Sequence, residues 1–264
     1  MLNDIPARWR TVSNKGTMQL LGASLDPRMV SMVEVAARVT DAQIQRASAL
    51  SHRAMVEPLA LAVGMSQREA ESCGDVLDAL QVIIDLADNL TDADEDRSRG
   101  LDLATRYEGL PLPALQCLPP LMMAAVMGAL PGLFPAPRRA QAAALRTTSV
   151  LSRMVLGQLA PGDSRERIDG ASGQQGLLLC LPLWLTHDGS PEADRRLREV
   201  ERWAFLFGCT WQLHQDVLDA PSDRRAQSAL ARGILAVRAA WPTMAPFREH
   251  EALAPEALMA GGLC

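Results

Sequence analysis

Apolar residues recur at helical spacing along most of the chain, and no segment alternates apolar and polar residues as a half-buried strand does. In one apolar stretch Leu77, Leu80, Ile84 and Ala87 repeat every three or four positions. Leu, Ala, Met and Arg, which all favour helices, dominate the composition. The sequence therefore predicts an all-α protein.

Two helix starts can be read directly from the sequence. Asp26-Pro27 and Ser190-Pro191 each place a capping side chain before a proline at the first helical position. Proline-rich breaks around 109–120 and 131–137 indicate junctions between helices of one bundle. We expect helices near residues 27–50, 58–64, 68–93, 100–107, 119–130, 137–160, 170–187, 191–220 and 225–240.

Length and charge limit the domain organisation and the classes of partner. A chain of 264 residues can form one sizeable core, and no repeat or low-complexity linker divides it, so we expect a single domain over residues 1–264. A net charge of −5 argues against nonspecific binding of nucleic acid. Lys15 is the only lysine, so contacts to phosphate must come from arginine, backbone amides or a metal ion.

Cysteine usage and hydropathy predict a cytoplasmic protein without a transmembrane segment. The five cysteines are scattered without CxxC spacing, which argues against a disulfide framework or a zinc site. Two stretches, 109–136 and 170–186, carry no charge. Prolines interrupt the first and the second is short for a span, so we expect both to be buried bundle helices.

An acidic segment follows the apolar stretch described above. Asp85, Asp88 and Asp92 are spaced i, i+3 and i+7, which places three carboxylates along one helical face. Like charges at this spacing repel one another unless a cation binds there. A solvated acidic helix end is the alternative interpretation.

A second acidic face is expected in a strongly apolar helix farther along the chain. Gln212, Asp216 and Asp219 are spaced i, i+4 and i+7. Two acidic faces on apolar helices suit Mg²⁺, which takes few carboxylates and completes its octahedron with water and phosphate oxygens. Bundle interiors are where such sites are built.

The two segments resemble the paired aspartate-rich motifs of trans-isoprenyl diphosphate synthases. Asp88-Asn89-Leu-Thr-Asp92, with Arg97-Ser-Arg99-Gly100 behind it, is similar to the family's first motif, Asp-Asp-x-x-Asp followed by Arg-Arg-Gly. Trp211-Gln212-Leu-His214-Gln215-Asp216-Val-Leu-Asp219 is similar to the second motif, and Leu156-Gly157-Gln158-Leu159 resembles the Gly-Gln element between them. The similar region covers roughly residues 75–220.

The resemblance implies a class I isoprenoid-synthase-type helical bundle with a central apolar cavity, an allylic isoprenyl diphosphate as substrate, and a homodimer. It implies that Mg²⁺ is bound by the catalytic residues Asp88, Asp92, Asp216 and Asp219. It further implies that substrate is contacted by Arg97, Arg99, Gln158, Gln212, Asn89 and Gln215. Met122, Met123, Phe207 and Trp211 are candidates to line the cavity, with ordinary core packing as the alternative for each.

The chain also departs from the family pattern. Asn89 and Gln215 each replace one aspartate of a pair, which reduces the negative charge. Where the family binds a second, nonallylic diphosphate, this chain has neutral or acidic residues, namely Gln81, Gln174, Gln175 and Glu57. Arg53 is the one nearby residue expected to compensate in part.

Three hypotheses follow. The first is a terpene-synthase-like enzyme that ionises an allylic diphosphate and completes the reaction by cyclisation, elimination or transfer. The second is a chain-elongating prenyltransferase with altered diphosphate contacts. The third is a catalytically silent relative that binds prenyl groups or acts as a partner subunit. Retention of the four aspartates favours activity, and the altered second pocket favours the first hypothesis over the second.

Overall fold

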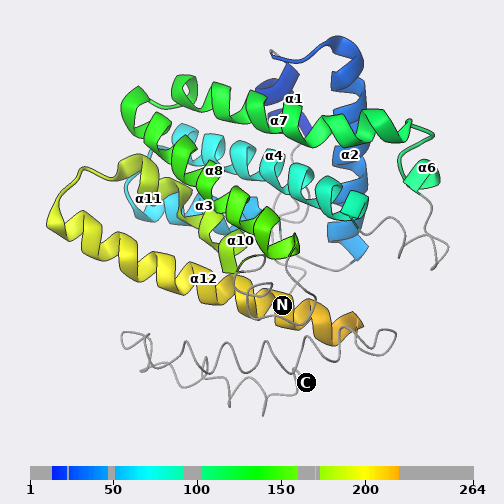
Figure 1. The fold of residues 1–264 in the computed structure, drawn as a ribbon. Coiled ribbons are helices and arrows are strands. Elements are labelled where there is room, and N and C mark those ends of the chain that lie inside the picture. Colours follow the sequence, from blue (N-terminus) through cyan, green and yellow to red (C-terminus); the bar gives the residue numbers. More distant parts are fainter. Residues whose placement is uncertain are drawn as a thin grey trace. The chain divides into compact units, whose positions relative to one another are not determined.

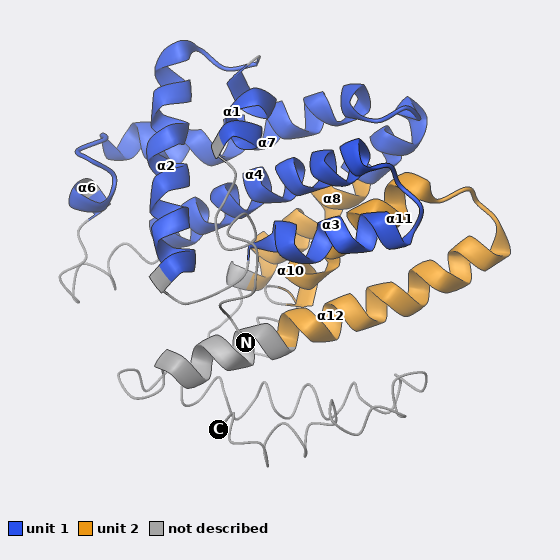
Figure 2. Ribbon diagram, turned by 180° about the vertical axis from the view of Figure 1, so that it is seen from behind, with its two compact units in different colours: residues 1–144 blue, residues 145–264 orange. Residues whose placement is uncertain are grey.

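The computed structural model describes residues 14–22, 24–46, 51–91, 103–159, 170 and 173–219. All regular elements in these ranges are helices, which confirms the all-α prediction. Residue contacts group the chain into two compact units, Met1–Ala144 and Leu145–Cys264, coloured separately in Figure 2.

The first unit is organised around one central helix (Figure 1). Helix α4 packs against α1, α2, α3 and α7. The unit also contains α6 and the start of α8. The bounds are α1 (Asn14–Gly22), α2 (Pro27–Arg46), α3 (His52–Ala62), α4 (Gln67–Thr91), α6 (Leu103–Arg106), α7 (Leu112–Leu133) and α8 (Pro137–Leu159).

Helix α4 begins with reciprocal capping contacts and is buried along most of its length. The backbone amide of Ser66 donates to Glu69 Oε2 at 2.8 Å, and the Glu69 amide donates to Ser66 Oγ at 3.3 Å. Leu77, Leu80 and Leu86 are at most 1% exposed. Burial of this apolar surface from several sides makes α4 the core of the first unit.

The expected capping contacts are present at both predicted helix starts. The Arg28 amide donates to Asp26 Oδ1 at 2.9 Å where α2 begins. The Ala193 amide donates to Ser190 Oγ at 3.1 Å where α12 begins. These local signals therefore predicted both starts correctly.

Helix α3 begins six residues earlier than the sequence predicted, because Pro58 lies inside the helix and not at its first turn. The first turns of α3 are held by buried residues, including Arg53, Val56 and Glu57. Arg53 and Glu57 form an i, i+4 ion pair within the helix. This packing and pairing offset the backbone hydrogen bond that proline cannot donate.

Helix α7 is also longer than predicted. It runs unbroken through Pro119, Pro120 and Pro131, which were expected to mark helix junctions. Leu118 and Met122 flank the first two prolines and are fully buried, so tertiary packing holds the helix across them.

One side of α7 is buried and the other is exposed. In the part of the chain that the structure describes, α7 is the one helix long and apolar enough to cross a membrane, and 28% of its most apolar window is buried. Leu112 and Leu121 are 46% and 42% exposed. The expectation of a buried bundle helix is therefore met on one side of α7 and not on the other.

The second unit contains the rest of α8 and the elements α10 (Gln174–Leu177), η4 (Leu178–Cys180), α11 (Leu181–Thr186) and α12 (Pro191–Asp219). Residues 178–185 are all buried, as expected for the second uncharged stretch. Gly176 lies so close to the Ala204 carbonyl that a Cβ would overlap it, which explains the close packing of α10 on α12. The helix predicted at 225–240 lies outside the described residues.

Candidate functional site

The first acidic segment forms the last turns of α4. Asp85 is half-buried, Asp88 is exposed, and Asn89 is 7% exposed. Asp92, Arg97 and Arg99 lie outside the described residues, so their predicted roles remain predictions. The described carboxylates therefore lie where the apolar core of α4 meets solvent.

The environment of Asp85 is unfavourable for a negative charge. Burial, and then the neighbouring charge of Asp88, raise the pKa of Asp85 to about 7 from its ordinary value of 3.8. A hydrogen bond with Thr40 opposes this rise in pKa. Repulsion between two close carboxylates is the electrostatic condition that binding of a cation relieves.

Helix α2 supplies two polar contacts to this end of α4. Thr40, which is 1% exposed, bonds Asp85, and Gln43 Nε2 donates to Asn89 Oδ1 at 3.2 Å. Thr40 and Gln43 are three residues apart, and Asp85 and Asn89 are four apart, so both pairs lie along facing sides of the two helices.

Arg106 and Tyr107, at the end of α6, complete the polar contacts. Asn89 Nδ2 donates to the Tyr107 hydroxyl at 2.8 Å, and Arg106 Nη1 donates to Asn89 Oδ1. Burial raises the pKa of Tyr107 to about 12, with smaller influences from Asn89, Arg106, Asp85 and Asp88. Each of these four groups therefore interacts electrostatically with the Tyr107 hydroxyl.

Sequence reasoning missed Thr40, Gln43, Arg106 and Tyr107. Tyr107 is the only tyrosine of the chain, and this rarity was the one available signal. The structure places Asn89, predicted to contact substrate, inside this hydrogen-bonded cluster. Substrate contact by Asn89 remains a prediction.

The second acidic segment forms the last turns of a regular helix, α12. Helix α12 continues to Asp219, so Gln212, Asp216 and Asp219 have the helical spacing that the sequence predicted. The side chains of residues 210–219, including Gln215, lie outside the description. The prediction that both acidic segments face one cavity joins residues of two separate units and remains a prediction.

The Gly-Gln element lies in the last turn of α8. Gly157 is buried, and a Cβ on Gly170 would lie 2.6 Å from the Gly157 Cα. Glycine is therefore required for this close backbone approach. The side chain of Gln158 lies outside the description, and its substrate contact remains a prediction.

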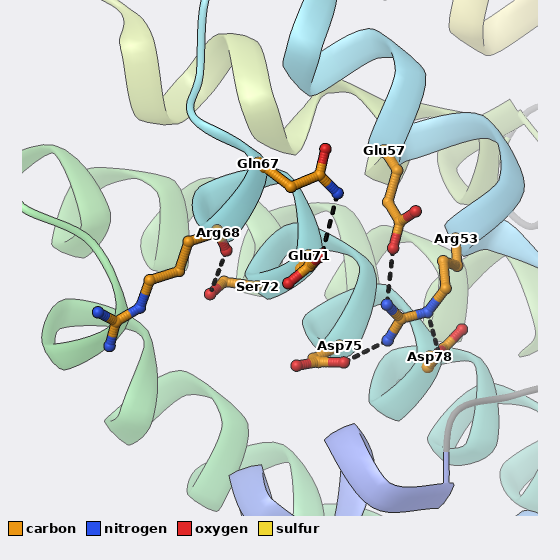
Figure 3. Close-up of polar contacts among 8 residues, drawn as sticks. All are labelled: Arg53, Glu57, Gln67, Arg68, Glu71, Ser72, Asp75 and Asp78. Carbon is orange, nitrogen blue, oxygen red and sulfur yellow. Dashed lines mark hydrogen bonds and ion pairs between the residues drawn. The ribbon is translucent and has the colours of Figure 1, made fainter. Parts of the chain in front are cut away.

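A second polar cluster, centred on Arg53, lies between α3 and α4 (Figure 3). Arg53 Nε donates to Asp78 Oδ2 at 2.7 Å, Nη1 donates to Glu57 Oε1 at 2.7 Å, and Nη2 donates to Asp75. The side chains of Arg53, Glu57 and Asp78 are 8%, 4% and 0% exposed. One guanidinium thus faces three carboxylates in the interior of the first unit.

Two glycines make room for the Arg53 cluster. A Cβ on Gly74 would lie 2.8 Å from both Arg53 Nη1 and Glu57 Oε1, and a Cβ on Gly16 of α1 would overlap the Asp75 carboxylate. Burial alone disfavours the guanidinium charge, but Asp78 and Asp75 raise the pKa of Arg53 above its ordinary value. Arg53 therefore stays charged and is used within the fold.

His52 and Gln81 are likewise used in local structure. Gln81 Oε1 accepts a hydrogen bond from the His52 backbone amide at 3.1 Å, and Gln81 is 9% exposed. Burial lowers the pKa of His52 to about 4, against a hydrogen bond with Gln81 that raises the pKa. His52 is therefore neutral at physiological pH.

Within the described ranges, no three His, Cys, Asp or Glu side chains are grouped in a way that would hold a metal ion. Cys73, Cys117 and Cys180 are free thiols. Searches of protein-family models, curated proteins and solved structures found no match to this chain.

Proposed function

We propose that this protein is an isoprenoid-synthase-like enzyme that uses Mg²⁺ to ionise an allylic isoprenyl diphosphate, followed by cyclisation, elimination or transfer. The observation that carries the proposal is the pair Asp85 and Asp88, which share one face at the C-terminal end of α4. Asp92, Asp216 and Asp219 are proposed to complete the set of magnesium ligands.

The donor set fits Mg²⁺. This ion binds through one or two protein carboxylates and takes its remaining ligands from water and phosphate oxygens, so it does not need three grouped protein ligands. Asp85 and Asp88 repel each other, and a divalent cation would remove that repulsion. Asp88 is exposed, so an ion and its waters can reach it.

The proposed chemistry follows from what a diphosphate needs in order to leave. When bound, the metal would neutralise charge on the leaving group. Asp85 and Asp88 would orient the ion, while apolar side chains would exclude water from the carbocation. Met122 and Met123, the described candidates on α7, are buried and half-buried respectively, which also fits ordinary core packing.

The Arg53 cluster favours a single-substrate reaction over chain elongation. Elongation requires a second diphosphate, and a sheltered diphosphate needs several positive partners. The guanidinium of Arg53, the expected compensating residue, is bound by Glu57, Asp75 and Asp78. These carboxylates occupy N–H donors of Arg53 that a second diphosphate would otherwise use.

Thermal unfolding with and without Mg²⁺ plus pyrophosphate tests the proposed site. A ligand that binds the native state raises the melting temperature by mass action. We expect this rise in the wild type and its loss in Asp88→Asn and in Asp216→Asn. Glu71→Gln, which removes an exposed acid on the same helix, is the matched control and retains the rise. An unchanged rise in both aspartate variants would place the ligand elsewhere.

Product analysis distinguishes the three hypotheses. With Mg²⁺, isopentenyl diphosphate and geranyl or farnesyl diphosphate, we expect pyrophosphate release from the allylic substrate without a longer diphosphate, as measured by mass spectrometry. Efficient formation of a diphosphate extended by five carbons supports the elongating enzyme instead. Tight binding without turnover supports the catalytically silent relative.

A further inference from the structure

Helix α7 has an exposed face that carries no charge. Pro113, Cys117, Leu121, Ala124 and Gly128 recur every three or four residues and are all exposed, so they lie along one side of the helix. We call these five residues the α7 face. The whole stretch of residues 109–136 contains no Asp, Glu, Lys, Arg or His, so the helix adds no charge beside this face.

The opposite side of α7 is fixed in the first unit. Leu115, Leu118, Met122 and Val126 are at most 1% exposed, and α7 packs against α4, α1 and α2. The helix is long and apolar enough to cross a membrane, but lipid cannot surround it while one side lies in the protein core. An apolar partner can therefore meet α7 only from its exposed side.

The α7 face is by itself too small for a stable interface with a second copy of the chain. A helix of 22 residues is about 33 Å long and about 10 Å wide, so one side offers a strip of about 330 Å². A stable protein interface buries about 800 Å² on each partner. Such interfaces also depend on aromatic and arginine anchors, and α7 contains neither kind of residue.

A lipid surface has neither requirement. Helices with one apolar side lie in the plane of a membrane interface, where apolar side chains need no matched hydrogen-bond partners. Positive charge follows directly after α7, because Arg138, in the first turn of α8, is exposed and comes after the short connection 134–136. An exposed arginine close to an apolar strip attracts anionic headgroups, which the net charge of −5 would otherwise repel.

We propose that the α7 face binds a lipid surface, with the axis of α7 in the plane of the membrane and Arg138 at the anionic headgroups. The helix lies on the membrane and does not span it. This inference does not depend on the proposed function, because no residue of the α7 face belongs to the acidic site.

Co-sedimentation of the full-length protein with vesicles tests the inference. We expect the wild type to bind phosphatidylcholine vesicles, and to bind more tightly when they also contain phosphatidylglycerol. Leu121→Glu should weaken binding by about 10- to 100-fold, which corresponds to the burial of one leucine side chain. Leu61→Glu is the matched control and should bind as the wild type does, because Leu61 lies on α3 and is 46% exposed against 42% for Leu121. A wild type that sediments with neither kind of vesicle would overturn the inference.

Arg138→Gln separates the electrostatic contribution from the apolar one. We expect binding to the anionic vesicles to weaken by about 5-fold, the contribution of one basic side chain near an anionic surface. Binding to vesicles of phosphatidylcholine alone should be unchanged. Equal weakening on both kinds of vesicle would overturn the role of Arg138.

Two further measurements distinguish lipid binding from misfolding of a variant and from self-association. A solvent-sensitive fluorophore on Cys117, in a Cys264→Ser background, should emit at shorter wavelength when vesicles are added, and an unchanged spectrum would overturn the inference with the rest of the face intact. Sedimentation velocity without lipid tests the second copy of the chain. A wild-type dimer that Leu121→Glu converts to monomers would show that a second chain covers the α7 face, and lipid binding there would be overturned.

Discussion

At the residue scale, Arg53 shows how burial sets the cost of an unpaired charge. Its three carboxylate partners come from two helices, and Glu57 and Asp78 are almost fully enclosed. Desolvated charges of this kind are tolerated only while they remain paired. Removing the charge of Arg53 should therefore lower the free energy of unfolding far more than removing the charge of an exposed arginine.

Arg53→Met should lower the free energy of unfolding by about 3–5 kcal/mol, because it removes the positive charge that Glu57, Asp75 and Asp78 share. Arg38→Met, which breaks the exposed pair with Glu108, should cost about 1 kcal/mol or less. Urea denaturation at neutral pH measures both. Equal losses in the two variants would contradict the buried, structural role of Arg53.

Because of Asp85, we expect the free energy of unfolding to fall as pH rises. The pKa of Asp85 is about 7 in the folded state against an ordinary value of 3.8, so the folded state binds the proton more tightly. This contribution to stability is lost as pH rises from about 4 to 7. Asp85→Asn removes the loss, so the variant should gain on the order of 1–3 kcal/mol over the wild type between pH 4 and pH 8.

Urea denaturation of both proteins in metal-free buffer at pH 4, 6 and 8 measures this gain. The expected difference between variant and wild type increases with pH and levels off above pH 7. A constant difference across the series would show that Asp85 titrates normally in the folded protein.

At the element scale, glycine has opposite roles in α4 and α7. Gly74 of α4 lies against the Arg53 and Glu57 side chains, where a Cβ finds atoms within 2.8 Å. Gly128 of α7 is exposed, and a Cβ there meets nothing within 4 Å. The first glycine is required by close packing, and the second only adds backbone freedom to the unfolded chain.

Gly74→Ala should therefore destabilise the protein by about 1–3 kcal/mol through overpacking. Gly128→Ala, the same change in an exposed helix interior, should stabilise it by about 0.5–1 kcal/mol. Chemical denaturation of the pair gives both values. The same sign for both substitutions would contradict the close contact at Gly74.

At the scale of the whole molecule, the reactivity of the described cysteines measures whether each unit is folded. Cys73 lies in the first unit, Cys180 and Cys209 lie in the second, and all three are buried. Burial raises the pKa of Cys73 and of Cys180 above the ordinary value, which removes the reactive thiolate. Cys117, on the exposed side of α7, is accessible.

In a Cys264→Ser background, the native protein should react with Ellman's reagent at one thiol, that of Cys117. The buried thiols should react only after denaturant opens the units. Absorbance at native and denaturing urea concentrations counts the reacting groups, and a Cys117→Ser variant identifies the native one. Fast reaction of Cys73 or Cys180 in the native state would contradict their burial.

The sequence alone determined the helical class, both capped helix starts and the extents of α4 and α12, because caps and apolar periodicity act over a few residues of chain. It also located the acidic turns at the ends of those helices. Only the tertiary structure decided that α3 and α7 continue through prolines, since packing from other helices offsets the lost hydrogen bonds. The capture of Arg53 by Asp75 and Asp78, and the meeting of Asn89 with Arg106 and Tyr107, join residues 17 to 25 positions apart. Contacts over such separations depend on how helices pack, and helical periodicity carries no information about which side chains of two helices will meet.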